Sequence, residues 1–425
     1  MSAGAERLRD RLRRNLAGEG VGIASVCSAH PFVLRAALAD ARARGGCALI
    51  EATCNQVNHR GGYTGMDPAG FRDLVHAEAD AIGLPRELVV LGGDHLGPNP
   101  WRSEAEGAAM DKACAMVAAY AGAGFGKIHL DASMPLVADP VPLPDEVVAE
   151  RAAALCAAAE AVASEPPVYV IGTEVPTPGG ALEELDHLAV TRVEDAEHTI
   201  DVHRRAFAAR GLEAAWERVI AVVVQPGVEF GQSEVAVFEP DRARALSGCA
   251  EGPGGLPFEA HSTDYQPESA LRALVQGHFA ILKVGPELSF AMREAIYALD
   301  AIEAELLPRE DRAGLRDVVE RAMLAEPRWW AGHYGGDEAA QRLARSYSLS
   351  DRIRYYWARP EAAAALDRLL GNLRRAPIPP ALVSQYLPVQ HAALRDGRIG
   401  AGPAALIGDR IAQVLGRYAR ACGIA

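Results

Sequence analysis

The sequence predicts an α/β protein: a (β/α)8 barrel, or TIM barrel, followed by a helical C-terminal extension. Eight short runs rich in apolar and β-branched residues recur along the first two thirds of the chain, and an alanine-rich stretch follows each run. Such alternation is typical of parallel strands joined by helical crossovers. Eight units over about 280 residues match the length of a barrel, although a doubly wound sheet can be assembled from the same elements.

The eight predicted strands are spaced evenly enough for one helix between each pair. They cover residues 22–27, 48–53, 89–94, 127–131, 168–173, 219–225, 257–261 and 279–285. From about Ala301 the strand-like runs stop, and a helical pattern continues with breaks at Pro327, Pro360 and residues 377–380. No flexible linker composition precedes this part. We therefore expect a barrel over residues 1–300 and a helical extension over residues 301–425 that packs on it.

Composition excludes several classes of function. The formal net charge of −13 disfavours a nucleic-acid partner, which would call for surplus clustered Lys and Arg. No apolar run approaches the roughly 18–20 residues needed to cross a bilayer. The arginine-rich N-terminus lacks the apolar segment of a secretory signal. Seven cysteines without CxxC spacing indicate reduced thiols. We expect a cytoplasmic protein with no nucleic-acid or membrane partner.

Polar residues gather where the predicted strands end, which is where barrel enzymes carry their chemistry. Taken strand by strand, the candidates are Glu51 and Asn55, Asp94 and His95, Asp131 and Ser133, Glu174, Gln225, His261 and Asp264, and Lys283. Strand four also carries His129. One polar loop residue would mean little, but their recurrence at a single rim indicates a binding site.

The strongest local motif is GGDHLGP at residues 92–98, a glycine-flanked Asp-His pair at a strand end. Asp94 is suited to proton transfer and His95 to metal binding. With His261 and a carboxylate such as Glu174 or Asp131, His95 would give the mixed nitrogen and oxygen ligands that zinc or manganese accepts. A purely structural, hydrogen-bonded Asp-His pair is the alternative.

Lysine is rare in this chain: only Lys112, Lys127 and Lys283 stand among 43 basic residues. Two of the three fall on predicted strands, so we expect them to pair with an active-site carboxylate or phosphate, or to form a Schiff base. A merely salt-bridged lysine is the alternative for each.

Two further motifs bear on phosphate binding. The glycines at residues 122–126 lack the spacing and the Ser or Thr of a phosphate-binding P-loop, so we expect no nucleotide cofactor. In the extension, Ser350 precedes a predicted helix that carries Arg352, which would reach over the rim to hold a phosphate. The same aromatic segment is equally consistent with a helix that docks the extension on the barrel.

The motifs together resemble the Z-type subunit family of class II D-tagatose-1,6-bisphosphate aldolases. The resemblance covers essentially the whole chain and rests on residues 25–31, 51–58, 61–66, GGDHLGP at 92–98, KIHLDASM at 127–134, 172–176, EAHSTDYQ at 259–266 and SLSDRIRYYW at 348–357. It implies a TIM-barrel protein of tagatose, galactitol or N-acetylgalactosamine catabolism. Family members have been described as non-catalytic partners that support a catalytic aldolase subunit; others are labelled tagatose-6-phosphate kinases or look like hexose-phosphate 4-epimerases.

The more distant catalytic aldolase subunits imply roles for single residues. Asp94 matches their catalytic acid/base, and His95 and His261 match two zinc histidines. Asp131, Glu174 and Lys283 match residues of their strands four, five and eight. Two departures stand out: Gln225 replaces a zinc histidine on strand six, and residues 262–265 replace the glycine-rich phosphate loop.

Three functions of different class follow. The first is an aldolase subunit that supports a catalytic partner and binds a ketose phosphate; the second is a metal-dependent ketohexose-6-phosphate 4-epimerase acting alone by retro-aldol chemistry, with a Schiff-base variant; the third is a sugar-phosphate kinase. For the second we expect Asp94, Glu174 and Lys283 to be catalytic, whereas the first predicts little effect of Asp94→Asn on the assembled activity. We expect His95 and His261 to hold zinc or manganese, and Glu51, Asn55, Asp131, Ser133, Gln225, Asp264 and Arg352 to contact the sugar phosphate. Self-association is left open.

Overall fold

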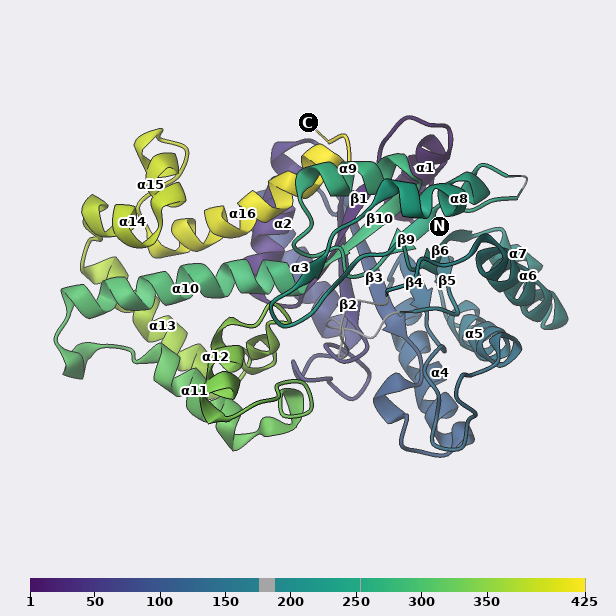
Figure 1. Ribbon diagram of the computed structural model, residues 1–425, viewed down its shortest axis with the longest axis horizontal. Helices are drawn as coiled ribbons and strands as arrows, with labels where there is room; N and C mark the ends of the chain where they lie inside the picture. Colours follow the sequence, from purple (N-terminus) through teal and green to yellow (C-terminus); the bar gives the residue numbers. More distant parts are fainter. Residues whose placement is uncertain (176–187, 253, 425) are drawn as a thin grey trace.

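Eight parallel strands close into a barrel in the computed structural model, which describes residues 1–175, 188–252 and 254–424 (Figure 1). Around the barrel the strands are β1 (Ile23–Cys27), β2 (Ala48–Thr53), β3 (Val89–Leu96), β4 (Lys127–Leu130), β5 (Val168–Ile171), β6 (Val219–Val224), β9 (Phe258–Ala260) and β10 (Phe279–Val284), which pairs with β1. The predicted TIM barrel is confirmed, and the doubly wound alternative is excluded.

The two ends of the barrel interior differ in chemistry. Near the strand starts the lining is apolar, with Ile23, Leu49 and Val90 packed against Leu8 and other residues of the N-terminal helix α1 (Ala3–Leu16). This helix packs over that end of the barrel. The buried lysines and carboxylates of the described interior form a network with Asp94, which lies toward the carboxyl end of β3, so the polar site faces the opposite mouth.

An outer ring of helices covers the strands, as the alanine-rich stretches predict. It consists of α2 (Pro31–Ala43), α3 (Pro68–Ile82), α4 (Glu106–Gly122), α5 (Asp145–Glu160), α6 (Val193–Ala209) with the short α7 (Glu213–Trp216), α8 (Pro240–Ala250) and α9 (Glu268–Gln276). Consecutive helices pack on one another around the ring. A two-stranded hairpin, β7 (Glu229–Phe230) and β8 (Val235–Ala236), lies in the connection after β6.

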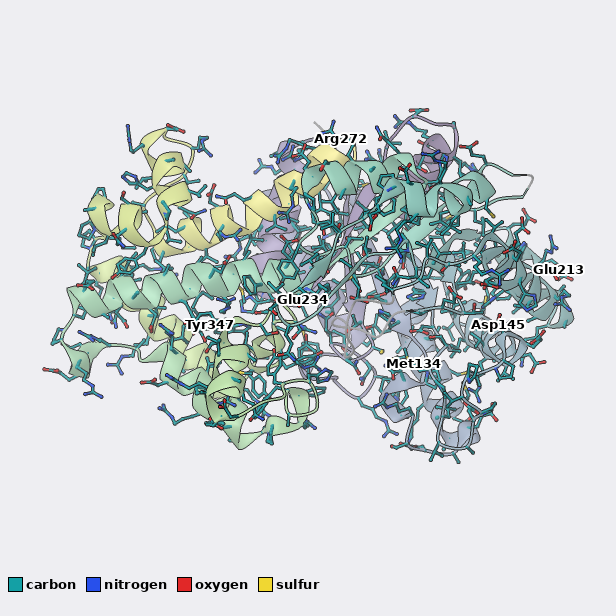
Figure 2. The ribbon with its side chains drawn as sticks, in the orientation of Figure 1. Met134, Asp145, Glu213, Glu234, Arg272 and Tyr347 are labelled. Carbon is teal, nitrogen blue, oxygen red and sulfur yellow. The ribbon has the colours of Figure 1, made fainter. Side chains whose placement is uncertain are left out.

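The helical extension begins inside a barrel helix. Helix α10 (Pro286–Leu306) follows β10 and runs out from the barrel, so residue 301 falls within a continuous helix (Figure 1). Five more helices follow: α11 (Leu315–Ala325), α12 (Glu338–Tyr347), α13 (Pro360–Arg375), α14 (Pro380–Tyr386) and α15 (Pro388–Arg395). The labelled side chains Tyr347 of α12 and Glu213 of α7 lie at opposite sides of the molecule (Figure 2).

The last helix, α16 (Pro403–Ala421), returns to the barrel. It packs against α10, α2 and α9, and also against strand β1. It thereby fills the gap in the outer ring between the seventh helix and the first, where the eighth barrel helix would lie. Two apolar residues at its centre, Ile411 and Val414, are buried. No helix in the described part of the chain is long and apolar enough to span a bilayer.

Candidate active site

Asp94 and His95 both line a pocket at the carboxyl end of the barrel, although neighbouring residues of a strand normally point to opposite faces. Two backbone features account for this. The pairing of β3 with β4 shifts register between Gly93 and Leu96, and His95 adopts a left-handed φ of 50°. A bulge of this kind re-aims side chains near an active site, and the strained φ at a non-glycine residue needs support from its surroundings.

The glycines of this motif leave room for the site. A Cβ on Gly97 would lie 1.6 Å from the carbonyl oxygen of Asp131, and one on Gly92 would lie 2.6 Å from Cγ of Glu51. Both contacts are far below van der Waals distance. Strand β3 can therefore approach its two neighbours this closely only with glycine at both positions.

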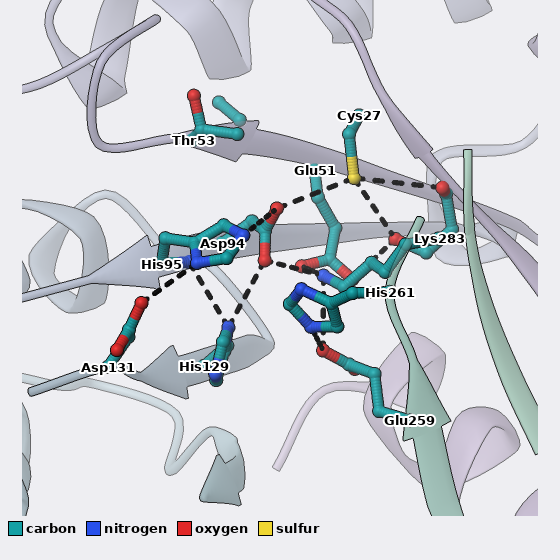
Figure 3. Close-up of polar contacts among 12 residues, drawn as sticks. Cys27, Glu51, Thr53, Asp94, His95, His129, Asp131, Glu259, His261 and Lys283 are labelled. Carbon is teal, nitrogen blue, oxygen red and sulfur yellow. Dashed lines mark hydrogen bonds and ion pairs between the residues drawn. The ribbon is translucent and has the colours of Figure 1, made fainter. Parts of the chain in front are cut away.

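Three buried histidines converge beside Asp94 (Figure 3). The ring centres of His95, His129 and His261 lie 4.8, 5.1 and 5.3 Å apart in pairs. Nδ1 of His129 is 3.2 Å from Oδ1 of Asp94, and Nε2 of His261 is 3.0 Å from Oε1 of Glu259. Three strands, β3, β4 and β9, and the start of the loop after β9 thus supply one compact cluster.

The cluster suits a divalent metal ion. Asp94, His129, Glu259 and His261 each offer one ligand atom, and all four atoms lie within 4.8 Å of one another. Nε2 of His129 is buried with no hydrogen-bond partner in the described part of the chain. Burial lowers the pKa of His261 to about 3, so its imidazole is neutral and its lone pair is free to bind a cation. Mixed imidazole and carboxylate ligands fit zinc or manganese.

His95 is held by carboxylates on both sides. Its Nδ1 lies 2.8 Å from Oδ2 of Asp131, and Asp131 also accepts hydrogen bonds from the backbone and hydroxyl of Ser133 at 3.1 and 2.7 Å. Burial alone would lower the pKa of His95, but Asp94 and Asp131 raise it above its ordinary value. Asp131 and Ser133 therefore fix the orientation of the His95 ring through hydrogen bonds.

A buried network of lysines and carboxylates lies beneath the histidines. Lys127 Nζ lies 2.8 Å from Glu51 and 2.7 Å from Glu259, and Lys283 Nζ lies 2.8 Å from both Glu51 and Asp94. Burial by itself would lower the pKa of Lys283, but the three carboxylates around it raise it well above its usual range. The same lysine, with His95, holds the pKa of Asp94 well below its usual range despite the opposing effect of burial.

Comparison with known proteins decides the family. The family model for D-tagatose-1,6-bisphosphate aldolase subunit GatZ/KbaZ-like proteins matches residues 8–423. The chain belongs to this family. It is 50% identical over 419 residues to the D-tagatose-1,6-bisphosphate aldolase subunit GatZ of Klebsiella pneumoniae, covering 98% of this chain and 99% of that protein. The resemblance inferred from the motifs is confirmed.

A solved structure of a GatZ/KbaZ-like relative agrees with this assignment. A protein of Sinorhizobium meliloti 1021, described as a probable tagatose 6 phosphate kinase, is 49% identical, with a TM-score of 0.88. The match covers 94% of this chain and all of that one. The barrel and its extension are therefore shared over essentially the whole length.

Of the residues expected from sequence, the structure brings together Asp94, His95, His261, Lys283, Glu51, Asp131 and Ser133, with Asn55 on the pocket wall. Glu174 is exposed, and its carboxylate accepts a hydrogen bond from Thr191 at 2.5 Å instead. Gln225 uses its side-chain oxygen to accept the backbone N–H groups of Gly227 and Val228 at 2.8 and 3.0 Å. Both side chains hold loops in shape because they satisfy local hydrogen bonds there.

Arg354, and not the expected Arg352, is the arginine of the extension that lines the active-site pocket. Arg352 donates its Nε to the carbonyl of Trp329 and lies in a neighbouring groove, whereas Arg354 lines the pocket and donates to the Tyr355 hydroxyl at 3.0 Å. The segment Arg352–Tyr356 forms a 3₁₀ turn, in which residues two apart point in different directions. Only this local geometry separates the two side chains.

His129, Glu259 and Arg354 are the main residues that sequence reasoning did not assign to the site. For His129 a signal was present: Lys127, His129 and Asp131 alternate along one strand, so all three face the barrel interior. If Lys127 and Asp131 point into the barrel, His129, which lies between them at the same spacing, must point into it too. No comparable periodicity precedes the 3₁₀ turn that carries Arg354.

Asp264 caps the start of α10 and makes stability pH-dependent. Its Oδ1 accepts the backbone N–H groups of Gly285 and Glu287 at 3.0 and 2.8 Å. Burial, with a smaller contribution from the nearby Glu287, raises its pKa from 3.8 to about 7. Between about pH 4 and pH 7 the native state thus holds a proton that the unfolded chain lacks, so stability attributable to Asp264 falls as pH rises through this window.

Asp264→Asn keeps the accepting oxygen and removes this titration. We expect the melting temperatures of the variant and the parent to agree near pH 4, and the variant to melt a few degrees higher at pH 8, in thermal unfolding followed by circular dichroism. Asp111→Asn, on an exposed face of α4, is the control. An equal difference at both pH values would contradict this assignment.

Proposed function

We propose that this chain is a subunit of a D-tagatose-1,6-bisphosphate aldolase and that its own barrel mouth binds a ketose phosphate and a divalent metal ion. The observation that carries the proposal is the buried cluster of Asp94 with three histidines at the floor of the pocket. Burying so many polar and charged groups costs stability, and a subunit that only supported its partner would have no physical need for them. We further propose that a catalytic class II aldolase subunit is its partner, in the cytoplasm.

The donor set fits the metal that the aldolase fold implies. His129, His261, Glu259 and Asp94 would hold it, with His95 oriented beside them by Asp131. A bound divalent ion supplies Lewis-acid polarisation of the substrate carbonyl. His129 is the natural replacement for the histidine that Gln225 does not provide, because its buried Nε2 has no hydrogen-bond partner among the described residues.

Asp94 is the group placed to move a proton. Lys283 and His95 keep its carboxylate ionised, so it can accept the proton of the substrate's C4 hydroxyl. As that O–H bond breaks, the C3–C4 bond opens, C4 becomes an aldehyde, and the electron pair remains on the C3 fragment. Reprotonation at C3 completes aldol cleavage. Lys283 stays cationic throughout and stabilises the negative charge of Glu51 and Asp94.

A second function uses the same residues. If the aldehyde fragment is retained and recloses on its other face, the result is 4-epimerisation of a ketohexose 6-phosphate by the chain alone. The completeness of the Asp94 and histidine cluster favours this reading over a purely supporting role. Schiff-base chemistry is disfavoured, because it calls for a neutral amine and Lys283 is surrounded by carboxylates that raise its pKa.

The deciding experiment uses the purified chain, with and without a catalytic class II aldolase subunit. Fructose 6-phosphate and tagatose 1,6-bisphosphate are supplied with or without EDTA, and products are identified by NMR. Triose phosphates support the aldolase role, and metal-dependent tagatose 6-phosphate from the chain alone supports epimerisation. Activity that depends only on the partner, with no metal bound by this chain, would overturn a catalytic role for its own site.

The metal site can be tested apart from turnover. His129→Gln should lower the affinity for the metal because it removes a ligand. The loss should exceed the roughly 10–100-fold that follows when a residue that only hydrogen-bonds to a ligand is changed. Metal content after gel filtration is measured by plasma mass spectrometry. His203→Gln is the matched control, since His203 is equally buried and lies in α6 outside the cluster. Equal metal content in the two variants would exclude His129 as a ligand.

A further inference from the structure

A second hollow, which we term the arginine groove, adjoins the active-site pocket. It has a volume of about 680 Å³ and draws arginines from separate parts of the chain: Arg60 after β2, Arg102 after β3, and Arg328 and Arg352 in the extension. Met134, labelled in Figure 2, lies on its barrel side. None of the described residues that line it is Asp or Glu. In a chain with a net charge of −13, such a concentration of positive charge is unexpected.

These positive charges are poorly neutralised within the described part of the chain. Arg328 pairs with Glu326 at 2.5 Å, but no carboxylate of residues 1–175, 188–252 or 254–424 lies within ion-pair distance of Arg60 or Arg102. Arg352 is only 5% exposed, and its Nη1 has no hydrogen-bond partner there. A buried guanidinium without a counter-charge lowers the stability of the fold unless a bound anion neutralises it.

The groove adjoins the catalytic pocket and shares part of its wall. Asn55, Tyr63 and Tyr355 line both. Trp329 stacks on Tyr355 with ring centres 4.8 Å apart, which gives the groove a flat aromatic wall. Because the two hollows share these three residues, the groove lies next to the space in which a ligand beside Asp94 would bind.

The usual phosphate position of a TIM barrel is occupied in this chain. That position lies in the loops after the seventh and eighth strands, beside a helix N-terminus. Here the Asp264 carboxylate accepts the N–H groups of Gly285 and Glu287 at the start of α10. Those two donors are therefore already used by Asp264, which favours a phosphate site elsewhere at the barrel mouth.

We infer that the arginine groove binds a phosphate group of the ketose phosphate substrate. This inference rests on the proposed function for its substrate, and on the groove itself for its chemistry. Guanidinium groups bind phosphate oxygens through paired N–H donors, and Arg60, Arg102 and Arg352, which have no carboxylate partner in the described part of the chain, offer enough positive charge for a phosphate dianion. Nη1 of Arg352 is a buried donor with no hydrogen-bond partner among the described residues.

The test is a double variant, Arg60→Gln with Arg102→Gln, because no described contact uses either side chain and the fold should be retained. Arg321→Gln, exposed on α11 outside the groove, is the control. Calorimetric titration with tagatose 1,6-bisphosphate should show a Kd about tenfold or more higher in the double variant and unchanged in the control. An unchanged Kd in the double variant would overturn the inference.

Further titrations identify which phosphate is bound. Equal weakening for tagatose 6-phosphate assigns the 6-phosphate to the groove, and weakening for the bisphosphate alone assigns the 1-phosphate; both support the inference. Groove-dependent binding of ATP without binding of either ketose phosphate would overturn it. If the parent protein binds no ketose phosphate, the proposed function fails, and inorganic phosphate then tests the groove alone: weaker binding by the double variant supports a phosphate site, and equal binding overturns it.

Discussion

Asp94→Asn should lower the ketose-phosphate turnover that this chain carries out by about 10²–10⁴-fold, the usual contribution of a general acid/base. Asparagine keeps the size of the side chain and its oxygen near His129, but it cannot accept the substrate proton. Binding of the bisphosphate should persist, because the arginine groove is untouched. Steady-state kinetics with NMR product identification measures the first effect, and calorimetric titration measures the second.

The fold should survive this change. Lys283 keeps its contacts with Glu51 and Glu259, at 2.8 and 3.3 Å, so it is not left unpaired. Asp111→Asn provides a control with the same change of charge on an exposed surface. If the assembled aldolase works equally well with Asn at position 94, the site is an inherited binding site and the catalytic chemistry belongs to the partner.

Lys127→Met should lower the free energy of unfolding by about 3–5 kcal/mol, which is typical of removing one partner from a buried ion pair. Lys127 is fully buried and lies between Glu51 and Glu259. Methionine fills nearly the same space, but it leaves both carboxylates short of a counter-charge in the barrel interior. Urea unfolding followed by circular dichroism measures the change.

Lys112 supplies a matched control for this experiment. Its ammonium pairs with Glu104 on the surface, where both side chains are partly exposed. Exposed pairs contribute about 0–1 kcal/mol, so Lys112→Met should leave the urea midpoint nearly unchanged. A similarly small effect for Lys127→Met would mean that Lys283 alone balances the buried carboxylates.

The sequence by itself determined the barrel and the location of its polar rim. Alternation of strand-like and alanine-rich runs defines parallel βα units, and closure of eight such units puts every strand's carboxyl end at one mouth. The GGDHLGP motif then identified Asp94 and His95, because glycines around an Asp-His pair at a strand end indicate a crowded site. The two-residue periodicity of strand four also places His129 on the inner face. Its role in the site could be recognised only once Asp94 and His261 were known to lie beside it.

The tertiary structure alone decided which rim residues meet. Glu174 and Gln225 stand at strand ends like Asp94, but local hydrogen bonds to Thr191 and to the loop after β6 engage them elsewhere. A side chain goes where its hydrogen bonds are satisfied, and the partners of loop residues are set by backbone geometry that sequence spacing does not encode. The return of α16 to the barrel depends in the same way on contacts between residues far apart in the chain. So does the arginine groove, because Arg60, Arg102 and Arg352 become neighbours only when the extension packs over the mouth of the barrel.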